Sequence, residues 1–230
     1  MLARPAIAAV VAVTLFAACG ERNPVAPAST TPGVEAAHAG GSDGVSTADV
    51  VTFADAELVV GSSRLVRNAA GVSYRLSTTG LEPGTAATLW IVIFNRPEEC
   101  AIEGFCGVSE DDFLNPDVMT DVMFAAGSLV GGSGKATFAG RRAVRDRSGS
   151  LHQVLGLPLF GLLDAREAEI HLVVRTHGPI IRGMKRAMTR TFNGGCGRVD
   201  PVLGPLPEHP FIGPEGPNVC EDVHFAVHQP

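Results

Sequence analysis

Apolar and polar residues alternate along much of this chain, and the alternation predicts β-strands. Val72, Tyr74 and Leu76 are separated by polar residues, which is the period-two pattern of a strand with one solvent-exposed face. The stretch 88–94 is apolar at both parities and rich in β-branched residues, so a central strand buried on both faces is expected there. Between them, residues 79–84 contain the Gly and Pro of a turn.

Later segments continue the β pattern. Residues 122–130 and 135–142 flank the glycine-rich sequence 131–134, and this arrangement predicts a β-hairpin. Further strands are expected at 169–176, 187–192 and 223–228. Trp90 and Tyr74, each the only residue of its kind, fall within strand patterns and are expected to pack in the core.

Helix signals are few and short. Ser109 stands three residues before Asp112 in a capping-box-like pattern that predicts a short helix near 111–114, and a helical turn is expected around 163–167. Six prolines in 198–218 exclude a regular helix or an interior strand there. The fold class predicted from these patterns is mainly β, an antiparallel β-sandwich or barrel with one or two short helices.

The first residues have the pattern of a secretory signal. Arg4 precedes an apolar run over 6–18. The run has thirteen residues, whereas a membrane-spanning helix needs about 20. Residues 1–18 are therefore interpreted as a signal peptide that is removed.

The end of this leader, Leu15-Phe16-Ala17-Ala18-Cys19-Gly20, resembles the lipobox of bacterial lipoproteins. In that family the cysteine becomes the new N-terminus and carries a lipid, and the residue three before it is usually Leu, where this chain has Phe16. The resemblance implies export, lipidation of Cys19 and anchoring to a membrane of the cell envelope, and Gly20 favours the outer membrane. The alternative is an ordinary secretory leader in which Cys19 is incidental or disulfide-bonded.

The rest of the chain divides into a linker and a domain. Residues 21–46 are rich in Pro, Ala, Ser, Thr and Gly without apolar spacing, a composition that cannot offset the entropy lost on ordering. We therefore expect a lipid-anchored flexible linker at 19–47. Residues 48–230 are long enough for one domain with its own core.

The cysteine count suits an exported protein with disulfides. Of five cysteines, assigning Cys19 to lipid leaves an even number in an oxidising compartment. Three pairings of the remaining four are open, and the one that closes the shorter loops joins Cys100 to Cys106 and Cys196 to Cys220. A shared metal site is the alternative, although no Cys-x-x-Cys spacing supports it.

Two short motifs resemble a CHRD domain, a β-rich module of secreted proteins. Val72-Ser73-Tyr74-Arg75-Leu76-Ser77-Thr78-Thr79-Gly80-Leu81 is similar to its opening strand and turn, and Ile181-Arg182-Gly183-Met184 to a stretch near its end. The resemblance covers about residues 72–192 and implies a β fold. The family's His-x-His pair has no counterpart here, because this chain has Thr88-Leu89-Trp90 at that place, so no role of those histidines carries over.

Histidines provide the candidate metal ligands. Imidazoles on neighbouring strands can bind Cu or Zn, and the residues concerned are His152, His171, His177, His224 and His228. Their spacing is not diagnostic of a metal site, so the competing interpretation is that they are exposed or hydrogen-bonded structural residues.

Charge and motifs narrow the function classes. The formal net charge is −6 and no basic stripe favours nucleic acid. No nucleophile elbow, zinc-protease helix or phosphate-binding loop is present, so no catalytic residue is assigned. The acids Glu98, Glu99, Glu110, Asp111 and Asp112 are interpreted as a solvated loop, with Ca²⁺ binding or a carboxylate pair as the alternative.

The sequence therefore predicts a cell-envelope lipoprotein that is a non-catalytic binding or structural module. Its expected partners are the membrane, through the lipid on Cys19, and a protein, glycan or other ligand of the envelope. The alternative is a Cu- or Zn-binding β-sandwich protein that uses the strand histidines.

Overall fold

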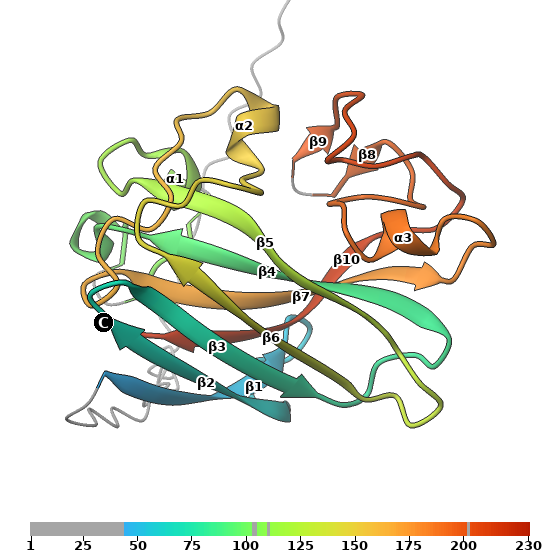
Figure 1. Cartoon of the computed structure of the whole chain (residues 1–230), viewed down its shortest axis with the longest axis horizontal. Helices are drawn as coiled ribbons and strands as arrows, with labels where there is room; N and C mark the ends of the chain where they lie inside the picture. Colours follow the sequence, from blue (N-terminus) through green and yellow to red (C-terminus); the bar gives the residue numbers. More distant parts are fainter. Residues whose placement is uncertain (1–43, 103–104, 110, 202) are drawn as a thin grey trace, which may run out of the picture. The chain divides into compact units, whose positions relative to one another are not determined.

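One curled antiparallel sheet dominates the structure, with short helices in the loops beside it (Figure 1). The computed structural model describes residues 44–102, 105–109, 111–201 and 203–230. The strands are β1 (Val45–Thr52), β2 (Val59–Asn68), β3 (Gly71–Thr78), β4 (Thr85–Phe94), β5 (Thr120–Leu129), β6 (Ala136–Ala143), β7 (Glu169–Pro179), β8 (Val199–Asp200), β9 (Gly204–Pro205) and β10 (Glu221–His228). The helices are the 3-10 turn η1 (Pro97–Glu99), α1 (Asp111–Leu114), α2 (His152–Leu155) and α3 (Lys185–Met188). The predicted mainly β fold is confirmed.

The main sheet has the strand order β5-β4-β7-β10-β1-β2-β3-β6, and its paired strands are antiparallel. β10 at the end of the chain lies between β7 and β1, so it joins the group β5-β4-β7 to the group β1-β2-β3-β6. Short β8 and β9 pair with each other outside this sheet. Within the described residues, no helix has both the length and the apolar character needed to span a membrane.

The sheet is nearly closed into a barrel, and a seam remains between β5 and β6. Side chains bridge this seam: the Tyr74 hydroxyl donates to the Ala125 carbonyl at 3.3 Å, and Arg142 Nη2 donates to the Phe124 carbonyl at 2.7 Å. The predicted hairpin of 122–130 with 135–142 is therefore wrong. The two strands follow each other in the chain, but β5 pairs with β4 and β6 pairs with β3.

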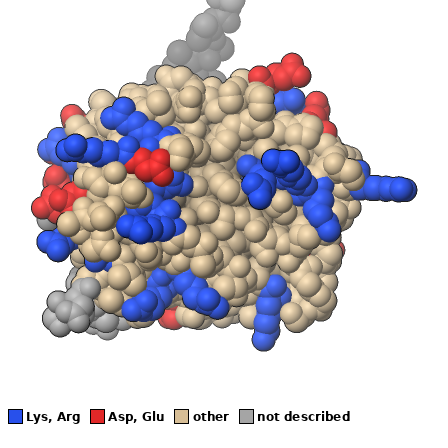
Figure 2. All heavy atoms as spheres, viewed as in Figure 1, with Lys and Arg blue, Asp and Glu red and all other residues tan. Residues whose placement is uncertain are grey.

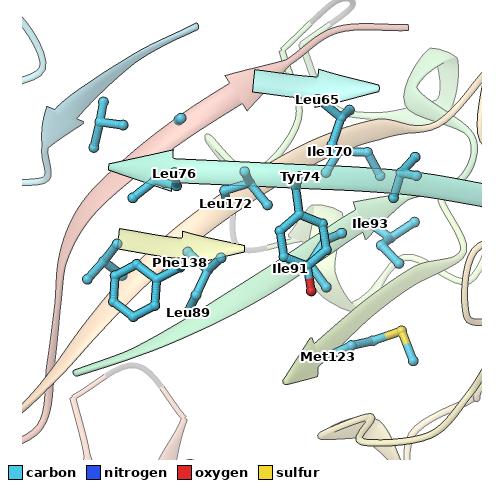
Figure 3. Packing of buried hydrophobic residues seen from close by; sticks show 14 of the residues in the cluster. Leu65, Tyr74, Leu76, Leu89, Ile91, Ile93, Met123, Phe138, Ile170 and Leu172 are labelled. Atoms are coloured by element: carbon cyan, nitrogen blue, oxygen red, sulfur yellow. The ribbon is translucent and has the colours of Figure 1, made fainter. Parts of the chain in front are cut away.

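The inner face of the curled sheet encloses the main hydrophobic core (Figure 3). Six strands contribute the labelled side chains, which are Leu65, Tyr74, Leu76, Leu89, Ile91, Ile93, Met123, Phe138, Ile170 and Leu172. Each is at most 4% exposed. Full burial of one such aliphatic side chain contributes roughly 1.5–3 kcal/mol. The predicted inward alternation of β3 and the predicted core position of Tyr74 are confirmed.

A second core lies on the outer face of β4 and β7. Three loop segments, 97–118, 150–162 and 180–220, pack there, and we call their described residues the covering layer. Trp90 on β4 is at its centre and makes edge-to-face contacts with Phe124, Phe192 and Phe211 at centroid distances of 5.1–5.7 Å. All ten residues of β4 are consequently buried, as the apolar pattern of 88–94 predicts.

The outer face of β2, β3 and β6 has no such cover. Outward residues such as Arg64, Arg75 and Arg141 are exposed, whereas their neighbours Leu65, Tyr74 and Leu76 are buried. Strands β2 and β3 therefore have one wet and one dry face.

The end of the barrel near the C-terminus is closed by a buried arginine. Arg67 donates from Nη1 to the Ala165 and Ala168 carbonyls, both at 2.8 Å, and from Nη2 to the His228 and Gln229 carbonyls, both at 2.9 Å. Its burial lowers the pKa of the guanidinium to about 10. The arginine thus fixes the last strand to the loop before β7.

Several predicted elements differ from the observed ones. Residues 164–168 form a single helical-type turn, closed by a hydrogen bond from the Ala168 N–H to the Asp164 carbonyl at 3.3 Å, close to the helical turn expected at 163–167. The strand expected at 187–192 is wrong, because 187 and 188 end α3 and 189–192 are turn and bend residues. The strand β1 begins at Val45, within the segment assigned to the 19–47 linker, because 45–47 pair with residues of β2. The helix at 111–114 is present as α1, and the strand at 223–228 lies within β10.

Two disulfides join Cys100 to Cys106 and Cys196 to Cys220, the pairing preferred from the sequence. The first closes a short loop after β4, and the second ties the segment after α3 to the start of β10. Both lie in or next to the covering layer.

Candidate functional site

The outer face of β7 carries a row of polar side chains beneath the covering layer. Glu169, His171, Arg175 and His177 share this face, and all four are buried. Burying charged or polar groups is costly unless they are hydrogen-bonded. The partners of these side chains therefore determine what the row can do.

Arg175 is the most heavily bonded member of the row. Its Nη1 lies 3.0 Å from Asp222 Oδ1, its Nη2 donates to Asp200 Oδ2 and to Asn193 Oδ1, and its Nε donates to the Phe192 carbonyl at 3.1 Å. The guanidinium also lies over the Phe192 ring, 4.3 Å from its centroid. A single side chain thus fixes the segment 192–200 and the start of β10 to the sheet.

His177 is held as a neutral imidazole. Nδ1 lies 3.1 Å from the Gly194 carbonyl, which can only accept, so Nδ1 carries the proton. Nε2 then accepts from the Thr88 hydroxyl at 2.9 Å, and Thr88 Oγ1 accepts from the Trp90 indole at 2.9 Å. Burial lowers the pKa of His177 to about 4. Both ring nitrogens are therefore engaged, which leaves no lone pair directed at a ligand.

His171 and Glu169 form a buried pair near the first disulfide. His171 Nε2 lies 2.6 Å from Glu169 Oε1, and the same oxygen accepts the Cys106 backbone N–H at 2.9 Å. Within the described residues, Glu169 Oε2 is buried without a hydrogen-bond partner. The His171 ring packs against Phe94 at a centroid distance of 5.0 Å. This pair attaches Cys106, and with it the first disulfide, to β7.

His224 and His228 point into the barrel, which the sequence alone does not indicate. His224 Nδ1 lies 2.9 Å from Thr78 Oγ1, and burial lowers its pKa. His228 bonds Ser46 and Ser63 at 2.9 and 2.6 Å. Burial is the main reason that the pKa of His228 falls to about 4, and the Arg67 charge lowers it further.

His152 begins α2, and its Nδ1 lies 3.0 Å from the Pro158 carbonyl. Together these contacts show that all five histidines proposed as metal ligands are buried, each in hydrogen-bonding contact with a different set of protein groups. In the part of the chain that the structure describes, no three of them lie close enough to share one metal ion. The geometry gives the Cu or Zn alternative no support.

One cluster of metal-ligand type does occur among the described residues, formed by His177, Cys196 and Cys220, whose ligand atoms lie within 4.8 Å of one another. Cys220 Sγ is 3.3 Å from His177 Nδ1. The two sulfur atoms are bonded to each other, so neither is a thiolate that could bind a metal. The cluster is a disulfide packed on a neutral imidazole.

The acidic loop is only partly solvated, contrary to its interpretation from the sequence. Asp112 is 1% exposed, and its carboxylate accepts the backbone N–H groups of Ala101 and Gly107, both at 2.8 Å. Glu98 and Glu99 pair with the side chain of Arg96 at the surface. Asp112 therefore organises the first disulfide loop. Glu110 lies outside the described residues.

Sequence reasoning missed an open hollow beside β5 and α3, lined in part by Lys185, Arg186 and Arg190. A signal was available, because no acidic residue occurs between Glu169 and Asp200.

The leader, Cys19 and most of the 19–47 linker lie outside the described residues, so these predictions stay predictions. Compared with family models, curated proteins and solved structures, the chain matches none.

Proposed function

We propose that this chain is an exported, lipid-anchored protein of the cell envelope whose β domain is a non-catalytic binding module. The leader pattern and its lipobox-like end at Cys19 support export and lipid anchoring. The two disulfides suit an oxidising compartment outside the cytoplasm.

The observation that carries the binding role is the use of buried polar side chains to hold the covering layer. Arg175 fixes the segment 192–200, and Asp112 fixes the backbone at Ala101 and Gly107. Asp121 accepts the Gly161 N–H at 2.7 Å and the Ser150 hydroxyl, which fixes the segment around α2. A catalytic group needs access to substrate, whereas these groups are enclosed and engaged with protein. What remains is a fixed set of loops on a rigid sheet, the arrangement that suits ligand binding.

Lipid anchoring is tested by Cys19→Ser in the full chain. We expect wild-type protein in the membrane fraction as the processed form, and Cys19→Ser in the soluble fraction or unprocessed. Ser29→Ala in the linker is the matched control and keeps the wild-type distribution. If Cys19→Ser remains membrane-bound and processed like wild type, lipid anchoring at Cys19 is wrong.

The binding role is tested by hydrogen exchange of the full chain with and without a solubilised envelope extract. We expect amides of the covering layer and its rim to gain protection while those of the exposed face of β2 and β3 do not. Equal exchange everywhere with and without extract would contradict a binding module.

A further inference from the structure

An open hollow of about 570 Å³ lies between the edge strand β5 and the segment that contains α3. Its lining residues are Gly127, Leu129, Lys185, Arg186, Thr189 and Arg190. Ligand sites commonly measure roughly 300–1,000 Å³, so the hollow is large enough for a small ligand or a headgroup. Figure 2 shows Lys and Arg side chains gathered over α3 on this face of the molecule.

Backbone packing gives the hollow a fixed shape. A Cβ at Gly127 would lie 1.8 Å from the Thr189 carbonyl oxygen, so a glycine is required for the α3 segment to lie on β5. On the other side, Met188 is fully buried, and the Thr189 hydroxyl donates to the Lys185 carbonyl at 3.0 Å. The cationic side chains therefore project from an anchored segment.

The described part of the protein does not neutralise the cations of the hollow. Lys185, Arg186 and Arg190 are exposed, and none forms an ion pair with another described residue. This differs from the buried Arg142 and Arg175, which pair with carboxylates. In a chain with a net charge of −6, a stretch of thirty residues, 170–199, has no acid to balance these groups. The local potential favours an anion.

The lining also indicates which anion. It contains no aromatic ring on which a sugar could stack and no carboxylate or side-chain amide to accept sugar hydroxyls. Guanidinium groups match phosphate oxygens with paired N–H donors, and an ammonium adds a point charge. Leu129, 38% exposed at the same hollow, offers an apolar contact beside the cations.

We propose that this hollow binds the phosphate group of a lipid headgroup, with Lys185, Arg186 and Arg190 around the phosphate and Leu129 against the apolar end. The site deepens the proposed function, because it rests on the binding role and names the ligand class. A domain tethered to a membrane through Cys19 would meet such headgroups at high local concentration.

The test is calorimetric titration of the full chain, kept in a neutral maltoside detergent at low salt. The probes are water-soluble dihexanoylphosphatidate, dihexanoylphosphatidylcholine and inorganic phosphate. The test variant is Lys185→Gln/Arg186→Gln/Arg190→Gln. The matched control is Arg64→Gln/Arg75→Gln/Arg141→Gln, which removes the same charge from the uncovered sheet face. Thermal melts check that both variants are folded.

We expect saturable binding of phosphatidate at least tenfold tighter than of the other two probes. The test variant should lose at least tenfold in affinity, and the control variant less than twofold. Rising salt should weaken the binding, because the contacts are exposed. Lys185→Arg, which keeps the charge, should bind like wild type.

Three results would overturn the assignment. Equal affinity for inorganic phosphate and phosphatidate would make the hollow a simple anion site, and equal losses in both triple variants would reduce the effect to net charge. Absence of saturable binding would remove the site altogether. None of these results depends on lipidation of Cys19. The proposal of a headgroup site and the proposal of a lipid anchor can therefore be refuted separately.

Discussion

The two halves of the sheet share one barrel core, but their outer faces differ: one is covered by protein and the other is exposed to solvent. The outer face of β4 and β7 is buried under the covering layer, and its polar residues are enclosed in hydrogen bonds and ion pairs. The outer face of β2, β3 and β6 meets solvent, and its arginines are exposed. The same residue type therefore has two roles: Arg175 supports tertiary structure, whereas Arg75 lies on a wet surface.

This difference predicts in which half of the sheet a substitution should change the free energy of unfolding most. A buried charge that loses its partner is penalised heavily, while an exposed charge is screened by water and salt. Substitutions of matched residues in the two halves therefore measure how much the covering layer contributes to the free energy of unfolding.

The largest effect is expected for Arg175→Met, which removes the cation next to the buried Asp200 carboxylate. Breaking a buried ion pair typically costs about 3–5 kcal/mol, whereas the matched change Arg75→Met on the uncovered half should stay within about 0.5 kcal/mol. Urea unfolding followed by circular dichroism measures both. Comparable losses in the two variants would show that the covered half is not held by this side chain.

Loss of the second disulfide should be next in size. In the chain-entropy model, a bridge with a sequence separation of 24 contributes about 3 kcal/mol, and one with a separation of 6 about 2 kcal/mol. We expect Cys196→Ser/Cys220→Ser to lower the melting temperature more than Cys100→Ser/Cys106→Ser and to expose 198–218 to protease. Peptide mapping without reduction provides the direct check of the pairing, and a Cys196 linked to Cys100 or Cys106 would refute it.

A pH dependence should separate the covered half from the surface. His177 has a pKa of about 4 in the folded protein, whereas an unfolded histidine titrates near about 6.5. Stability is therefore fully present above pH 6.5 and falls as the pH is lowered towards 4, because the unfolded chain takes up the proton first. The expected loss from this residue is about 2 kcal/mol by pH 5.

Unfolding at pH 7 and pH 5 tests this dependence with His177→Gln, which should remove that loss. The matched control is His209→Gln at an exposed position, which should leave the pH dependence unchanged. A His177→Gln variant that loses as much stability as wild type between these pH values would rule out the buried imidazole as a source.

The smallest effect has the opposite sign and lies on the uncovered half. Arg64 and Arg75 stand directly opposite each other on β2 and β3, and like charges at such positions are destabilising. Arg64→Thr should therefore raise stability by up to about 0.5 kcal/mol. Ser62→Thr, which faces Ser77 in the same ladder, controls for the strand preference of threonine. A loss of stability in Arg64→Thr would show that repulsion between the two arginines is not a net destabilising contribution.

The sequence predicts the covered half of the sheet better than the rest. Strand β4 is apolar at both parities, so the local pattern predicts burial on both of its faces. Strand β2 gives no clear pattern, because it contains the buried Arg67, whose four carbonyl partners come from 165, 168, 228 and 229. A local hydropathy pattern cannot predict the burial of Arg67, because its hydrogen-bond partners are distant in the sequence.

The candidate site is less predictable than the fold. The histidine positions can be read directly, but whether an imidazole is exposed, free or hydrogen-bonded depends on partners such as Thr88 and Gly194 for His177. The misassigned strand at 187–192 has the same cause, since contact with Gly127 on β5 decides the path of that segment. Local sequence patterns do not contain these long-range contacts.

The position of β10 has a consequence for the order in which the molecule can be completed. The final strand provides the hydrogen-bond ladders that connect β7 with β1, so the sheet of the described residues stays in two pieces until the C-terminal residues have left the ribosome. Pairing over such long sequence separations is also slow. The two groups of strands can therefore be joined only late, after every other strand of the main sheet is already available for pairing.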